Sequence, residues 1–155
     1  MNRIFFNCGI RTTQGFGQNP EYYQKASNGA LKAHEGIDLV PTGGNIKIYS
    51  PVKGFVWYDQ DQPRGAYGNM IVIAEPYRKL NLYFCHMREN FLSPGDWVNP
   101  GDVIGVMGNT GNSFGAHLHL MINRWEKAPG SRLDYDNGYR GMVDPAPYLE
   151  EWCNV

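Results

Sequence analysis

The chain has 155 residues, enough to bury a hydrophobic core without disulfide or metal staples. A formal net charge of −1 gives no excess of positive charge for binding nucleic acid, and no run of like charges indicates binding to a membrane surface. The first residues hold too short an apolar run for a secretion signal, and no apolar stretch is long enough to span a bilayer. We expect one domain over residues 1–155, without a signal peptide, standing alone or cut from a longer chain.

Short strands separated by turns dominate the predicted elements. A weak helical signal at Pro20–Lys25 comes first. The clearest strands follow, and in chain order they are Gly54–Tyr58, Asn69–Glu75, Leu80–His86, Val103–Met107 and His117–Asn123. Turns rich in Gly, Pro and Asn separate them, Ala128–Gly141 is polar and aperiodic as a loop is, and Pro145–Trp152 gives a second weak helical signal. This spacing predicts a mainly β fold, an antiparallel sandwich or a rolled, barrel-like sheet with few short helices.

The cysteines give no sign of a disulfide framework. Cys8, Cys85 and Cys153 are odd in number, widely spaced and without a Cys-x-x-Cys pair. We expect reduced thiols, and a structural zinc site built on cysteines is unlike this pattern.

All four histidines lie in motifs suited to metal chemistry. His117 and His119 flank Leu118, and in a strand residues two apart point to the same face. The two imidazoles would therefore share one face while Leu118 packs into the other. His34 and Asp38, four residues apart, supply two more donors. A catalytic zinc site uses three protein ligands and a water, and His34, Asp38 and one histidine of the pair make up such a set.

The segment His34-Glu35-Gly36-Ile37-Asp38 resembles the helical His-Glu-x-x-His motif, with Asp in place of the second His. That motif needs a continuous helix, which Gly36 interrupts and the following Pro41 soon ends. We therefore expect Glu35 to be a solvated side chain rather than a general base.

His86 ends an alternating strand, and its neighbour Cys85 would by alternation point to the opposite face. We expect Cys85 to be a small core residue and not a metal ligand. The two histidines left after the ligands are chosen are available to accept a proton and to stabilise an oxyanion.

In order, the motifs are His-x-x-x-Asp, a strand ending Tyr-x-x-His, and Gly-Asn-Thr-Gly-Asn-Ser-x-Gly-x-His-Leu-His, within Gly15 to Leu149. They resemble the lysostaphin-type zinc endopeptidases of bacterial cell walls. The resemblance implies an antiparallel β structure with an open groove across one Zn²⁺ ion. Its metal ligands would be His34, Asp38 and His119, and its catalytic residues His86 and His117.

The function that the resemblance implies is zinc-dependent hydrolysis of peptide cross-links or stem peptides of bacterial peptidoglycan. Candidate groove residues, each of which can equally serve a local turn, are Tyr67, Asn69, Asn109, Ser113 and Phe114. Residues 13–23 resemble the phage branch of the family, in which such domains occur in lytic enzymes and tail components. We expect a monomer or one domain of a larger phage protein. It would act on the bacterial cell wall, either released at lysis or carried in the virion.

Two other functions fit parts of the pattern. A non-catalytic peptidoglycan-binding or activator module would resemble relatives that have lost ligands, whereas the ligand set here is complete. A zinc D,D-carboxypeptidase has a related site, but its His and Asp lie further apart than His34 and Asp38.

Overall fold

The computed structural model describes residues 5–7, 9–61 and 65–153, and ten strands and two helices lie within these ranges. In chain order they are β1 (Ile10–Gln14), α1 (Pro20–Ala26), β2 (Ile37–Pro41), β3 (Lys47–Tyr49), β4 (Gly54–Gln60), β5 (Asn69–Glu75), β6 (Leu80–Asn90), β7 (Trp97–Val98), β8 (Val103–Met107), β9 (Leu118–Arg124), β10 (Met142–Val143) and α2 (Ala146–Cys153).

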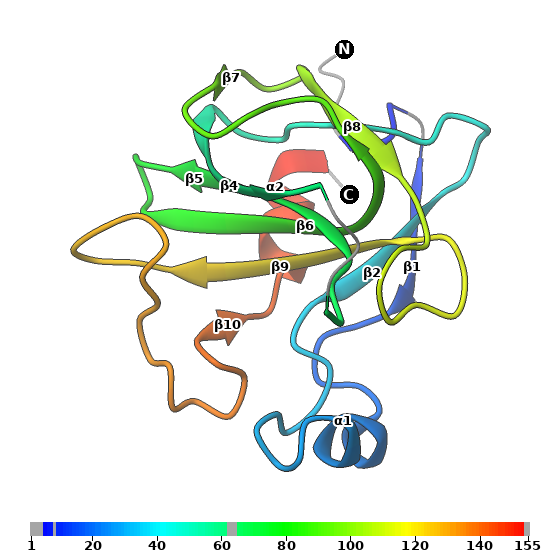
Figure 1. The fold of residues 1–155 in the computed structure, drawn as a ribbon, viewed down its shortest axis with the longest axis vertical. Helices are drawn as coiled ribbons and strands as arrows, with labels where there is room; N and C mark the ends of the chain where they lie inside the picture. Colours follow the sequence, from blue (N-terminus) through cyan, green and yellow to red (C-terminus); the bar gives the residue numbers. More distant parts are fainter. Residues whose placement is uncertain (1–4, 8, 62–64, 154–155) are drawn as a thin grey trace.

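All ten strands belong to one antiparallel sheet whose main path runs β1-β2-β9-β6-β5-β4-β7. β10 pairs with β9, while β8 pairs with the far end of β6 and with β3. Figure 1 shows β6 and β9 crossing the middle of the molecule, β8 curling over them and α1 standing apart at one end. The sheet therefore rolls over without closing, and the predicted mainly β, antiparallel fold with few short helices is confirmed.

The five predicted strands are all present, and the predicted bounds of β5 and β8 are exact. β6 runs beyond the predicted His86 to Asn90, and the two weak helical signals become α1 and α2. The residues 128–141 form no helix or strand, as expected of a loop. The short strands β1, β2, β3, β7 and β10 were not predicted.

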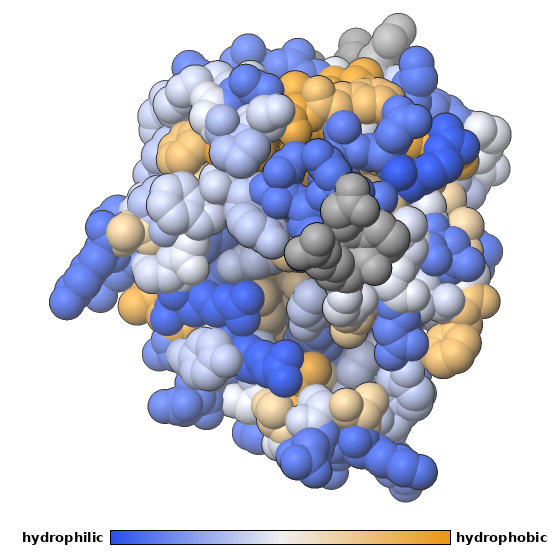
Figure 2. Space-filling view, viewed as in Figure 1, coloured by the Kyte–Doolittle hydropathy of each residue, from blue (hydrophilic) through white to orange (hydrophobic). Residues whose placement is uncertain are grey.

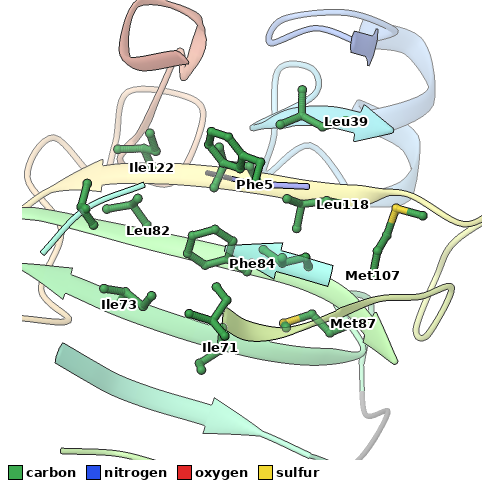
Figure 3. Packing of buried hydrophobic residues seen from close by; sticks show 14 of the residues in the cluster. Phe5, Leu39, Ile71, Ile73, Leu82, Phe84, Met87, Met107, Leu118 and Ile122 are labelled. Atoms are coloured by element: carbon green, nitrogen blue, oxygen red, sulfur yellow. The ribbon is translucent and has the colours of Figure 1, made fainter. Parts of the chain in front are cut away.

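The two faces of the central strands have different roles. Leu82 and Phe84 of β6 and Leu118 and Ile122 of β9 are fully buried in the main core, where Figure 3 shows them packed together. Full burial of such a side chain contributes about 1.5–3 kcal/mol. The residues in between point to the other face, where β6 and β9 contribute to a smaller apolar cluster of Val72, Tyr83, Cys85, Met121 and Met142. The histidines lie beside this second cluster.

Cys85 and Cys153 are free thiols, as predicted, while Cys8 lies outside the described residues. No helix in the described part of the chain is long and apolar enough to cross a membrane. The face in Figure 2 is mostly hydrophilic, with apolar residues gathered in separate smaller patches.

Candidate metal centre and groove

The candidate metal centre is built where β2 meets β9. Asp38 on β2 is the direct cross-strand partner of His119 on β9, so their side chains leave the sheet on the same face. His34 lies just before β2, and its main chain is tied to the segment after β1 by the bonds His34 N–H to Gln18 O (3.0 Å) and Gly17 N–H to His34 O (2.9 Å). Sheet pairing thus brings together residues that are 81 positions apart.

The donor atoms of these residues converge on one point. Nδ1 of His119 lies 2.8 Å from Oδ1 of Asp38 and 3.0 Å from Nε2 of His34. Nε2 of His34 lies 3.3 Å from the same Asp38 oxygen. His34, Asp38 and His119 are all buried and form a group that can hold a metal ion.

The chemistry of this donor set fits a zinc ion. Nδ1–H of His34 donates to the carbonyl oxygen of Gly15 at 2.9 Å, which leaves Nε2 with its lone pair facing the other two donors. Nδ1 of His119 has one proton at most, so it cannot satisfy both neighbours by hydrogen bonding. Two imidazole nitrogens and a carboxylate oxygen are common zinc donors, and a backbone carbonyl behind a ligating imidazole is the usual support.

The charge of the centre is set by Asp38. Burial alone would raise the pKa of the Asp38 carboxyl, but the contacts of its oxygen with the rings of His117, His119 and His34 hold that pKa well below its ordinary range. Asp38 is therefore ionised at neutral pH, as a metal ligand must be.

His86 and His117 lie beside the centre with their rings 4.9 Å apart. Nδ1–H of His86 donates to the Thr110 carbonyl oxygen and Nδ1–H of His117 to the Gly115 carbonyl oxygen, each at 2.7 Å. When neutral, both rings therefore carry the lone pair on Nε2, and Nε2 of His117 lies 3.5 Å from Asp38 Oδ1. Two histidines held in the same tautomer beside a metal centre suit proton transfer.

The two histidines differ in basicity. Burial, together with the nearby His119 and His117, lowers the pKa of His86 to about 4. Burial would also lower the pKa of His117, but its contact with the Asp38 carboxylate raises that pKa above the ordinary value. His117 is thus the more readily protonated of the two.

A β-bulge carries His86 into the groove. Asn69 pairs with Met87 and Ile71 pairs with Phe84, so β5 advances by two residues where β6 advances by three. Within this bulge His86 adopts a left-handed φ of 61°. The predicted alternation is therefore wrong at this point. Cys85 is the cross-strand partner of His119 and lies on the same face as the site, not on the face opposite His86.

Cys85 is nevertheless a core residue. It is 1% exposed and belongs to the smaller apolar cluster, and the metal-binding group does not include it. Burial and the nearby Glu35 and Asp38 carboxylates raise the pKa of the Cys85 thiol well above its ordinary value. The thiol stays protonated, whereas a zinc ligand would be a thiolate.

Glu35 is not the solvated side chain that the sequence predicts. It is 3% exposed, and one of its carboxylate oxygens accepts a hydrogen bond of 2.6 Å from the Tyr67 hydroxyl. The Tyr67 ring in turn lies nearly parallel to the His119 ring, at 5.9 Å between centroids. Glu35 thus supports the ring that packs against a candidate metal ligand, a role that depends on a residue far away in the sequence.

We expect Glu35→Gln to keep activity within about tenfold of the unsubstituted protein, because the amide oxygen still accepts the Tyr67 hydrogen bond. Tyr67→Phe removes that bond and should lower the free energy of unfolding by about 1 kcal/mol. Turnover and urea unfolding measure the two effects. A loss of about 1000-fold for Glu35→Gln would instead mark Glu35 as a general base.

A cavity of about 580 Å³ opens over the centre. Three of the five candidate groove residues, Tyr67, Ser113 and Phe114, line it. Asn69 and Asn109 are not among the lining residues: the Asn69 side chain donates to the Arg88 carbonyl oxygen, and Asn109 accepts a bond from Ser113. These two asparagines tie the surrounding turns together.

Other wall residues were not predicted from the sequence. Tyr22 and Tyr23 of α1 form one wall, and the Tyr22 ring meets the exposed Phe114 ring at 6.4 Å across the opening. The Tyr23 ring lies 5.1 Å from that of His34, and burial, with the nearby Asp38 and Glu35, raises the pKa of its phenol. The adjacent tyrosines shortly before His34 were the sequence feature that could have predicted this wall of the cavity. Arg140, from the loop before β10, completes the wall.

A sequence profile of peptidase family M23 matches residues 32–132, which include all the candidate metal ligands and both further histidines. The chain belongs to peptidase family M23. Members of this family are zinc-dependent, and its homologues of known activity are peptidoglycan-hydrolysing metallopeptidases.

Individual relatives agree. The chain is 30% identical over 103 residues to the peptidoglycan DD-endopeptidase ShyC of Vibrio cholerae, covering 65% of this chain and 23% of that protein. It is 26% identical over 142 residues to lysostaphin of Staphylococcus simulans, covering 88% of this chain and 24% of that protein. The chain therefore spans about a quarter of the length of these relatives.

Solved structures show the same fold. The catalytic domain of lysostaphin superposes with a TM-score of 0.69 at 24% identity, covering 91% of this chain and 92% of that one. A zinc-containing peptidase from Vibrio cholerae superposes with a TM-score of 0.65 at 25% identity, covering 92% of this chain and 38% of that one.

Proposed function

We propose that this M23 domain is a zinc-dependent endopeptidase that hydrolyses peptide cross-links or stem peptides of bacterial peptidoglycan. The observation that carries the proposal is the convergence of His34, Asp38 and His119, with His86 and His117 beside them, under an open cavity. Family membership supports the reaction class.

In this proposal His34, Asp38 and His119 hold the ion. A zinc ion there would acidify a water molecule and polarise the scissile carbonyl. His117 and His86 present Nε2 to the cavity, each oriented by a backbone carbonyl, so that one accepts a proton while the other donates to the developing oxyanion.

Mass spectrometry of digested cell walls tests the proposal. Peptidoglycan with direct meso-diaminopimelate–D-Ala cross-links and peptidoglycan with Gly bridges are each incubated with zinc-loaded protein and with His119→Ala. We expect new amine ends with the unsubstituted protein alone, and their masses identify the bond. If neither wall is cleaved, the endopeptidase proposal fails and a binding or activator role takes its place.

The biological setting is a further proposal, and it rests on residues 13–23. Their likeness to phage members favours a domain of a phage lysin or tail protein that acts on the wall.

A further inference from the structure

The loop between β9 and β10 brings an arginine to the wall of the groove. Arg140 lines the cavity and is the only lysine or arginine among its lining residues in the described part of the chain. The other charged lining residues are the acids Glu35 and Asp38. A negatively charged substrate group entering the cavity therefore finds one cationic side chain.

The Arg140 guanidinium has no ion pair and no hydrogen bond to another described residue, and the side chain is half-buried. Its neighbours in the same region are engaged. Arg124 pairs with Asp134 at 3.3 Å, and the Arg132 guanidinium lies over the Tyr83 ring and donates to the Arg140 carbonyl oxygen. The Arg140 fork is thus left available for a ligand.

The backbone around Arg140 is held in place. Arg140 adopts a left-handed φ of 53°, which is costly for a residue other than glycine. Asn137 Oδ1 accepts bonds from the N–H groups of Tyr139 (2.7 Å) and Gly141 (3.1 Å), and the Asn137 amide donates to the Met142 carbonyl oxygen. A strained conformation that the surrounding structure enforces is a common feature of binding sites.

A contact between aromatic rings anchors this loop as well. The ring of Tyr139 packs against that of Phe16, at 4.5 Å between centroids, and so joins the loop to the segment that precedes α1. The loop that carries Arg140 is therefore held by this ring contact as well as by the hydrogen bonds of Asn137.

Arg140 shares the cavity with the candidate centre, because Tyr67 and His119 line the same cavity. The Tyr67 ring lies nearly parallel to the His119 ring. Glu35 is already hydrogen-bonded to Tyr67 and makes no ion pair with Arg140.

We propose that Arg140 is a specificity-determining residue that binds a free carboxylate of the peptide substrate. The guanidinium matches a carboxylate with two parallel hydrogen bonds, which an amide cannot reproduce with the same charge. The domain would then favour stem peptides with free diaminopimelate and D-glutamate carboxylates over amidated stems or Gly bridges. This inference rests on the proposed endopeptidase function.

The test compares two cross-linked stem peptides that differ only in having these carboxyl groups free or amidated. The ratio of kcat/KM for acid over amide is measured for the unsubstituted protein, Arg140→Gln and Arg140→Lys, with Arg11→Gln as a control because Arg11 is exposed on β1. We expect a ratio of about 10 to 100 for the unsubstituted protein and the control. The ratio should fall to about one in Arg140→Gln and lie between in Arg140→Lys.

A ratio near one for the unsubstituted protein, or an unchanged ratio in Arg140→Gln, overturns the inference. Should neither peptide be cleaved by any variant, the endopeptidase proposal fails, and calorimetric titration of the same two peptides decides on Arg140 separately. Tighter binding of the acid that is lost in Arg140→Gln supports the carboxylate site; equal binding of acid and amide refutes it. Circular dichroism checks folding, and Arg140→Lys carries the comparison if Arg140→Gln does not fold.

Discussion

Replacing His119 by alanine is expected to abolish both metal binding and activity, whereas replacing His117 by alanine should abolish activity and leave most of the metal in place. Nδ1 of His119 contacts both other candidate donors, at 2.8 and 3.0 Å. His117 touches the same Asp38 oxygen only at 3.5 Å and lies outside the group of three. Loss of a proton-transfer residue typically costs 10²- to 10⁴-fold in rate.

Zinc content by atomic absorption and turnover of purified peptidoglycan measure the two effects side by side. The histidines are suitable for a matched comparison because they are two residues apart on the same side of one strand end. Equal zinc loss in both variants would show that the ligands are assigned wrongly.

The second large effect is expected at Gly36, which lies between His34 and β2. A Cβ atom at Gly36 would lie 2.5 Å from the Leu120 carbonyl oxygen and 2.8 Å from the His119 ring. Both contacts are too short, and one is with the backbone of β9, so β2 and β9 would have to separate. We expect Gly36→Ala to lower the free energy of unfolding by about 1–3 kcal/mol and to weaken zinc binding by displacing the His119 ring.

Gly44→Ala is the matched control. Gly44 is exposed, and a Cβ atom added there would have no heavy atom of the described residues within 4 Å beyond Gly44 itself and its two chain neighbours. Denaturant unfolding and zinc titration of both variants make the comparison. Wild-type zinc affinity and stability in Gly36→Ala would contradict the close packing of β2 on the His119 ring.

The elements that could be predicted are those whose pattern repeats within one segment. β5 and β8 have the predicted bounds because each is a run of β-forming residues between turn residues. β7 and β10 are two residues long, and β3 three, which is too short for any alternation to show. Their strand conformation depends on pairing with β4, β9 and β8.

The candidate site divides in the same way. The types of donor, the four-residue interval of His34 and Asp38, and the shared face of His117 and His119 are local properties that the sequence determines by itself. The prediction that Leu118 packs away from these histidines holds, since it lies in the main core.

Only the tertiary structure decided the position of Cys85, the burial of Glu35 and the presence of Arg140 on the groove wall. A bulge depends on the register between two strands. The sequence of β6 alone does not reveal that it advances by three residues where β5 advances by two. Glu35 is buried because Tyr67, 32 residues further on, supplies its hydrogen bond. Spacing within a segment fixes which side chains can act together, whereas contacts between distant segments fix which polar groups are buried, partnered or left free for a substrate.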